Sequence, residues 1–220
     1  MMFLAIDLSL YTNAIGETFF MTLVSSFISY VIGIPLGVLL YTTAKDGLTP
    51  NSGIYNVLSL IVNIFRSIPF LILLILVLPV TKAIVGTTIG AKAVIPPLVI
   101  SASPYIARMV ESSLKEVDLG VIEAAKSMGA TNFQIITKVL LSESKPSLLI
   151  GAAISITTIL GYSAMAGAVG GGGLGDVAIR YGYYRYNQDI MLITVVLLVI
   201  IVQILQEIFM GLARKSDKRL

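Results

Sequence analysis

The sequence contains no cysteine, no histidine and no tryptophan among its 220 residues. These absences exclude disulfides, thiol nucleophiles, imidazole bases and Cys/His metal sites. We therefore expect no catalytic residue and no metal ligand in this chain. Residues 1–16 also lack Lys and Arg, so the positively charged start of a secretory signal peptide is not expected.

Charged residues are scarce as well. They make up 12% of the chain, against 56% hydrophobic residues, and the net charge of +3 gives no reason to expect nucleic-acid binding. A helix needs roughly 20 apolar residues to cross a bilayer. Five stretches approach or exceed that length: residues 18–41, 55–79, 94–114, 146–169 and 190–212. They predict an all-α, polytopic membrane protein with about five transmembrane helices, forming one domain over residues 1–220 in contact with lipid.

The positive charges predict an orientation. Cytoplasmic loops of membrane proteins carry an excess of Lys and Arg. With the N-terminus outside and the C-terminus in the cytoplasm, nine Lys and Arg residues fall inside and four outside. The inside set is Lys45, Lys115, Lys126, Lys138, Lys145, Arg214, Lys215, Lys218 and Arg219, and the outside set is Lys82, Lys92, Arg180 and Arg185.

A few residues depart from the apolar character of the spans. Gly33 and Gly37 are four apart, which favours close approach of a second helix. Arg66 lies deep in the second span and either faces protein or water, or extends to the headgroups. Arg108 and Glu111 in the third span are three apart, and we expect them to pair on one helix face.

Two external segments have a distinctive composition. The glycine run at residues 170–173 lacks the Gly-Lys-Ser/Thr ending of a phosphate loop, so a flexible lid or a sharp re-entrant turn is expected instead. Residues 180–186 contain four tyrosines. Such a cluster is either an anchor at the membrane surface or a contact for a soluble partner outside the membrane.

Residues 117–145, between the third and fourth spans, are too polar to enter the bilayer and predict a helix–turn–helix. Asp118 is a good N-cap, and Gly129 is placed to end the first helix in a left-handed conformation. Thr131 and Gln134 match a capping box that starts the second helix. The apolar faces predicted from helical spacing consist of Ile122, Ala125 and Met128 in the first helix, and Phe133, Ile136 and Leu140 in the second. Physical chemistry leaves open whether these faces pack on the chain's own spans or on a peripheral cytoplasmic protein.

The same segment resembles a family motif. The residues are Glu123, Ala124, Ala125, Gly129, Val139 and Leu141. In this order and spacing they are similar to the EAA loop of bacterial ABC importer permeases, although the family's usual proline after the last leucine is Ser142 here. In that family the loop is the coupling element that docks into a groove of the cytoplasmic ATPase. The resemblance assigns this ATPase-coupling role to the six residues.

Further segments are similar to the permease family of methionine importers. They are residues 66–70, 104–111, 161–170 and 181–183. This resemblance implies the type I ABC importer permease fold in a bacterial cytoplasmic membrane, built as a homodimer. It also implies two cytoplasmic ATPase subunits and an external substrate-binding lipoprotein. ATP and Mg would be bound by the ATPase, and we expect no cofactor in this chain, which carries no nucleotide-binding motif of its own.

The expected activity is import of methionine, in its L- or D-form, or of a related small amino acid, by alternating access. Tyr162, Ser163 and Met165 are candidates for the gate, with ordinary helix packing as the alternative. A secondary transporter or channel is a second hypothesis, but the spans lack a central acidic residue and an internal repeat. A membrane enzyme is a poor fit without His, Cys or a buried carboxylate pair for acid–base chemistry, and composition alone leaves room for a structural protein.

Overall fold

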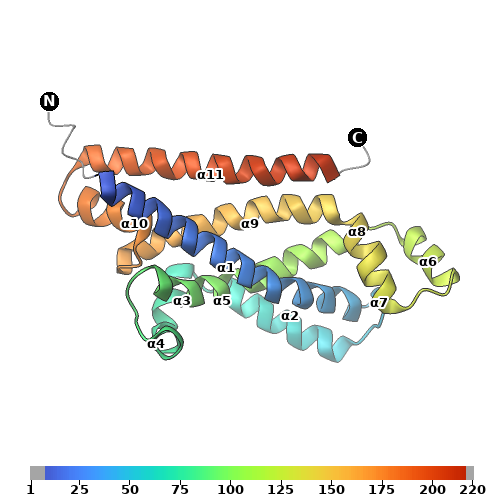
Figure 1. The fold of residues 1–220 in the computed structure, drawn as a ribbon. Coiled ribbons are helices and arrows are strands. Elements are labelled where there is room, and N and C mark those ends of the chain that lie inside the picture. Colours follow the sequence, from blue (N-terminus) through green and yellow to red (C-terminus); the bar gives the residue numbers. More distant parts are fainter. Residues whose placement is uncertain (1–7, 217–220) are drawn as a thin grey trace. The chain divides into compact units, whose positions relative to one another are not determined.

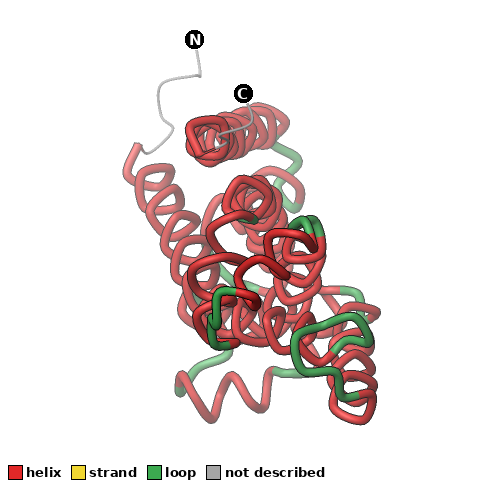
Figure 2. Tube along the Cα trace, turned by 90° about the vertical axis from the view of Figure 1, so that its right-hand side faces the viewer, coloured by secondary structure: helices red, strands yellow, loops and turns green. Residues whose placement is uncertain are grey.

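The computed structural model describes residues 8–216 and is built from helices, with no strand in that range (Figures 1 and 2). Lys218 and Arg219, which contribute to the predicted orientation, lie outside the described residues. The longer helices are α1 (Leu8–Thr43), α2 (Ser52–Ser67), α5 (Ala91–Lys115), α9 (Lys145–Ala166) and α11 (Gln188–Ser216). The shorter ones are α3 (Phe70–Leu76), α4 (Leu78–Val85), α6 (Leu119–Ser127), α7 (Asn132–Gln134), η1 (Ile135–Leu140), α8 (Leu141–Glu143), η2 (Gly167–Val169), α10 (Gly173–Val177) and η3 (Ala178–Tyr183).

Four of the five predicted spans are continuous helices in the structure. α1, α5, α9 with η2, and α11 are each long and apolar enough to cross a membrane. The predicted second span, residues 55–79, is wrong as a single helix, because α2 ends at Ser67 and the chain bends by 102° before α3. Pro69 accounts for the break, since proline has no N–H to donate and disfavours a helical conformation of the preceding residue.

The chain forms two compact units, each made of three separate segments. Within the described residues, the first contains 8–28, Ile68–Ser101 and Ile156–Leu205. The second contains Ser29–Ser67, Ala102–Ser155 and 206–216. The helix–turn–helix at residues 117–145 therefore belongs to the second unit, together with α2 and the C-terminal half of α5.

In the second unit, α1 packs closely against α5 at two glycines of α1. A Cβ on Gly33 would lie 2.6 Å from Ile106 Cγ2, and one on Gly37 would lie 2.5 Å from Val110 Cβ. Real Cβ atoms do not approach this closely, so only glycine permits the contact. The close approach predicted for Gly33 and Gly37 is confirmed. The adjoining core consists of Leu40, Val62 and Ala107, with Leu36, Tyr55 and Leu58 packed against it.

In the first unit, the glycine run forms a hydrogen-bonded turn that leads into α10. Gly170, Gly172 and Gly173 have positive φ angles, which side-chain-bearing residues rarely adopt. The Gly173 N–H donates to Glu17 Oε2 at 2.7 Å, and the N–H of the next residue donates to Thr18 Oγ1 at 2.9 Å. Of the two forms expected for this segment, the structure shows the sharp turn, attached to α1.

Candidate functional site

The helix–turn–helix, here called the coupling loop (residues 117–145), begins and turns as predicted. Asp118 caps α6 by accepting a hydrogen bond from the Gly120 N–H at 2.7 Å. Gly129 follows α6 with φ +81°, and its N–H donates to the Lys126 carbonyl at 2.9 Å. A left-handed residue at this place reverses the chain in a single step. In Figure 1, α6 and α7 lie beyond the ends of α5 and α9.

The second helix of the coupling loop also begins as predicted. Thr131 and Gln134 form a capping box, in which the Gln134 N–H donates to Thr131 Oγ1 at 3.3 Å and the Thr131 N–H donates to Gln134 Oε1 at 2.9 Å. After one turn of α7, the chain winds more widely into the π-helix η1. α8 then joins it to α9.

The predicted apolar face of the first helix is only partly correct. Ile122 and Ala125 are buried, but Met128 is 81% exposed. Met128 lies one residue beyond the end of α6, with φ −82° and ψ 3°. Its side chain therefore leaves the register that Ile122 and Ala125 share.

The predicted face of the second helix is wrong for Phe133, which is 74% exposed. The fully buried residues are Ile135 and Leu140, while Ile136 is half-buried. A π-helix bonds residues five apart, so it brings positions 135 and 140 onto one side instead of the positions expected for an α-helix.

The six EAA-like residues divide into inward and outward groups. Glu123, Ala124 and Gly129 are exposed, Ala125 is buried, and Val139 and Leu141 are half-buried. The coupling loop also exposes four large apolar side chains: Leu119, Val121, Met128 and Phe133. Several apolar side chains exposed on a polar segment are typical of a surface that another protein covers.

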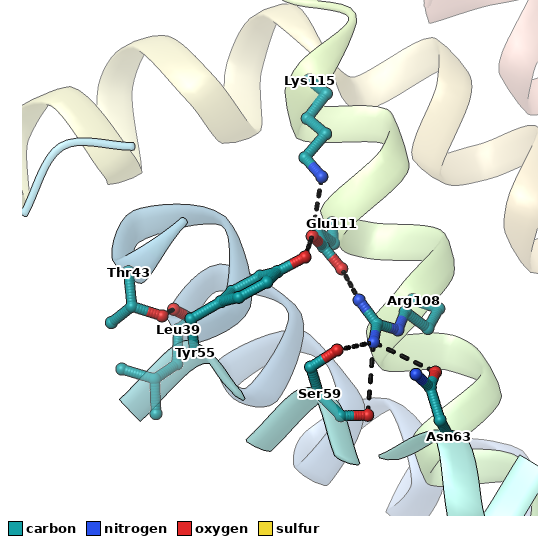
Figure 3. Close-up of polar contacts among 8 residues, drawn as sticks. All are labelled: Leu39, Thr43, Tyr55, Ser59, Asn63, Arg108, Glu111 and Lys115. Atoms are coloured by element: carbon teal, nitrogen blue, oxygen red, sulfur yellow. Dashed lines mark hydrogen bonds and ion pairs between the residues drawn. The ribbon is translucent and has the colours of Figure 1, made fainter. Parts of the chain in front are cut away.

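Next to the coupling loop, the last two turns of α5 hold a buried carboxylate (Figure 3). Glu111 is 3% exposed and forms two ion pairs, at 2.7 Å from Oε2 to Arg108 and at 2.7 Å from Oε1 to Lys115. The predicted pairing of Arg108 with Glu111 is confirmed. The Tyr55 hydroxyl on α2 donates a further hydrogen bond to Glu111 Oε1 at 3.3 Å.

The guanidinium of Arg108 reaches the same helix. Its NH2 group donates to Ser59 Oγ, to the Ser59 carbonyl at 3.3 Å, and to Asn63 Oδ1 at 3.0 Å. We call the six residues Tyr55, Ser59, Asn63, Arg108, Glu111 and Lys115 the Glu111 cluster. The sequence reasoning missed its α2 members. The signal was present, because Tyr55, Ser59 and Asn63 are four apart and lie on one face of a mostly apolar helix.

Arg66, the third predicted intramembrane polar residue, is outside this cluster. It lies in the last turn of α2 and is exposed. Its guanidinium forms no ion pair with the acidic residues that the structure describes. A cation in the last turn does interact favourably with the negative end of the helix dipole.

The three candidate gate residues on α9 have different surroundings. Tyr162 is half-buried and stacks on Phe70 of α3, with ring centroids 4.6 Å apart and planes within 3°. Ser163 is buried and donates to the Leu160 carbonyl at 2.8 Å. Met165 is 52% exposed. The structure therefore joins Tyr162 to α3 but does not bring the three side chains into one cluster, and the gate remains a prediction.

Outside the spans, the carboxyl group of Asp176 in α10 has a pKa above its usual value. Burial raises the pKa of the Asp176 carboxyl, and the nearby Glu17 carboxyl adds to the rise. The ion pair with Arg180, at 3.0 Å, opposes both effects. The pair thus stabilises a charge in a partly desolvated place beside the glycine turn.

These features define a class of protein: a multi-pass membrane protein, helical over the residues that the structure describes, with a capped helix–turn–helix that exposes apolar side chains. The chain belongs to the family of binding-protein-dependent transport system inner membrane components, whose family model matches residues 33–220. It is thus a permease component of a transport system and not an enzyme, as predicted.

Relatives over nearly the whole chain agree with this assignment. The chain is 51% identical over 215 residues to the probable D-methionine transport system permease protein MetI of Vibrio cholerae, covering 98% of this chain and 96% of that protein. It is 48% identical over 214 residues to the methionine import system permease protein MetP of Bacillus subtilis, covering 97% and 96%. The predicted resemblance to methionine importer permeases is confirmed.

Solved structures confirm the predicted fold. A chain of the MetNI methionine ABC transporter, in an inward-facing conformation, superimposes with a TM-score of 0.94 at 49% identity, covering 96% of this chain and 98% of that one. A bacterial alginate ABC transporter chain superimposes with a TM-score of 0.72 at 16% identity, which shows the fold alone. The chain therefore has the ABC importer permease fold.

Proposed function

We propose that this chain is the permease subunit of an ATP-driven importer for methionine, in its L- or D-form, or for a related small amino acid. The observation that carries the proposal is the 51% identity, over 98% of the chain, to a protein named a probable D-methionine permease. The inward-facing MetNI structure at 49% identity supports the same substrate class.

The proposed assembly contains two copies of this chain, two cytoplasmic ATPase subunits and an external substrate-binding lipoprotein. The N-terminus lies outside and the C-terminus in the cytoplasm. ATP and Mg are bound by the ATPase, and hydrolysis of the ATP supplies the energy. Support on this chain comes from the coupling loop, where exposed Glu123, Ala124 and Gly129 lie among exposed apolar side chains. A peripheral subunit would bury this surface and remove its apolar groups from water.

The proposed mechanism is alternating access driven through the coupling loop. The loop directly follows α5, which ends at Lys115, and its last helix, α8, leads into α9, which begins at Lys145. Ile122 and Ala125 fix α6 to the rest of the unit, and Ile135 and Leu140 fix η1. Closure of the two ATPases would therefore displace α5 and α9 together with the loop. Tyr162, Ser163 and Met165 remain our candidates for the gate at which the pore opens and closes.

Gly129 offers a sharp test of docking. A Cβ at Gly129 meets no heavy atom within 4 Å, and φ is +81°. Gly129→Ala and Gly129→Trp therefore impose the same backbone strain. Only the tryptophan side chain is large enough to fill the open space beside residue 129. We expect the tagged wild type and Gly129→Ala to co-purify with an ATPase from native membranes, and Gly129→Trp to lose it.

Uptake of labelled methionine by the same three strains then tests the substrate. Wild type and Gly129→Ala should accumulate methionine, and Gly129→Trp should fall to the level of cells lacking the permease. Purification of folded wild type without any ATPase would contradict the proposal. Equal loss in both variants would mean that the backbone turn, and not the surface beside it, is what matters for docking.

A further inference from the structure

We propose that Tyr55, Ser59 and Asn63 are positioning residues that make α2 move as one body with the coupling loop, so that ATP hydrolysis is coupled to transport. The inference rests on the proposed function, because it assumes that an ATPase displaces the loop. The three side chains attach α2 to Glu111 and Arg108 of α5 (Figure 3).

The attachment lies where motion of the coupling loop enters the membrane domain. Lys115 is the last residue of α5, and Asp118, the N-cap of α6, follows three positions later. Val117 between them is buried. Since an α-helix is stiff over two turns, displacement of α6 carries Lys115, Glu111 and Arg108 along with it.

Apart from the apolar core in which Val62 and Leu58 pack with Ala107, α2 has little else that fixes it to α5. Its only fully buried residue is Val62. Most of its large aliphatic side chains are exposed: Ile54, Val57, Leu60, Ile61 and Ile64. The polar face formed by Tyr55, Ser59 and Asn63 therefore carries much of the contact.

The contacts on this face are also directional. Hydrogen bonds to charged groups are roughly twice as strong as those between neutral groups, and they fix the distance and angle between donor and acceptor. Apolar packing alone would let α2 slide along α5, whereas Arg108 holds the two positions Ser59 and Asn63 at once. Loss of the α2 side-chain groups leaves Arg108, Glu111 and Lys115 paired within α5, so no unpaired charge results. Of the attachment, only the bond from Arg108 to the Ser59 backbone carbonyl is then left.

The test uses the complete complex in proteoliposomes, with its co-purified ATPase and the external substrate-binding lipoprotein. Because the chain contains no cysteine, spin labels can be placed at Val57→Cys on α2 and Ser112→Cys on α5, both exposed. The distance between the labels is compared without nucleotide and after trapping with ATP and vanadate. Methionine imported per ATP hydrolysed is measured in parallel on unlabelled protein.

In the wild type we expect the label distance to stay the same in both states. In the triple variant Tyr55→Phe, Ser59→Ala, Asn63→Leu, we expect a shift on trapping and a loss of about fivefold in methionine imported per ATP. Tyr55→Phe alone, which keeps the ring and its packing, should show a smaller change in the same direction. Asn56→Leu, an exposed position on the same helix, is the control and should behave as wild type.

Three results separate the possibilities. A wild-type label distance that changes on trapping would overturn the inference, because α2 would not follow α5. A triple variant with wild-type label distances and wild-type methionine per ATP would overturn it as well. A wild type that hydrolyses ATP without importing methionine or a related small amino acid would overturn the proposed function, and with it the coupling role of these residues.

Discussion

At the scale of single residues, Glu111 is the one charged side chain that is buried among the residues that the structure describes. It is 3% exposed and receives two cations and a hydroxyl. Taking a charge out of water is costly, and the ion pairs and hydrogen bonds offset this cost only while all partners are present. The structure therefore predicts that losing Glu111 does more damage than losing an exposed acid nearby.

We predict that Glu111→Ala destabilises the folded protein by about 3 kcal/mol, because Arg108 is left as a poorly paired cation. Glu116→Ala, an exposed acid just after α5, should change stability by less than about 0.5 kcal/mol. The measurement is the thermal unfolding midpoint of purified protein in detergent. Equal midpoints for the two variants would mean that Arg108 and Lys115 find other partners.

At the scale of elements, the contact of α1 with α5 depends on the missing side chain of Gly37. A Cβ there would lie 2.6 Å from the Ala107 carbonyl oxygen as well as 2.5 Å from Val110 Cβ. Backbone cannot yield as the end of a flexible side chain can, so the two helices would have to separate.

We predict that Gly37→Ala destabilises the protein by about 1–3 kcal/mol through overpacking. Gly16→Ala on the same helix meets no heavy atom within 4 Å and should be neutral or slightly stabilising. Both are compared by thermal unfolding. Loss of stability in Gly16→Ala alone would contradict the contact.

How far the sequence predicts an element depends on how local its cause is. The caps at Asp118 and Thr131 and the turn at Gly129 are fixed by neighbouring residues, and all three were predicted correctly. The π-helix η1 was not, because its wider winding changes no residue type and only moves Ile135 inward and Phe133 outward. The break before Pro69 was missed because the apolar run continues through it.

The Glu111 cluster shows a second limit of prediction. The pair of Arg108 with Glu111 is three residues apart on one helix and follows from helical geometry. The bond from Tyr55 joins residues 56 positions apart, and a single sequence does not say which helix lies beside α5. The six coupling residues came from the family resemblance, whereas helical spacing alone placed Ala125 on the buried face of α6 and left Ala124 off it, as the structure confirms.

At the scale of the whole molecule, the charges predict which ends of the helices meet the cytoplasm. We expect a membrane-impermeant maleimide to label Tyr184→Cys in intact spheroplasts and to label Asp46→Cys only after permeabilisation. Both positions are exposed, and the chain has no cysteine to give a background signal. The reverse labelling pattern would overturn the orientation, and labelling of both from outside would mean that an even number of spans crosses between the two positions, as when the bent pair of α2 and α3 does not cross.

The ion pairs of Glu111 have a consequence for biogenesis. Arg108, Glu111 and Lys115 lie on one helix, and both pairs close within it, at spacings of three and four residues. They can form as soon as α5 coils at the translocon, before any other span has packed. We therefore expect α5 to leave the translocon with a net charge of one from this triad instead of three separate charges, each of which would cost about 2.5–3.5 kcal/mol at the centre of a bilayer.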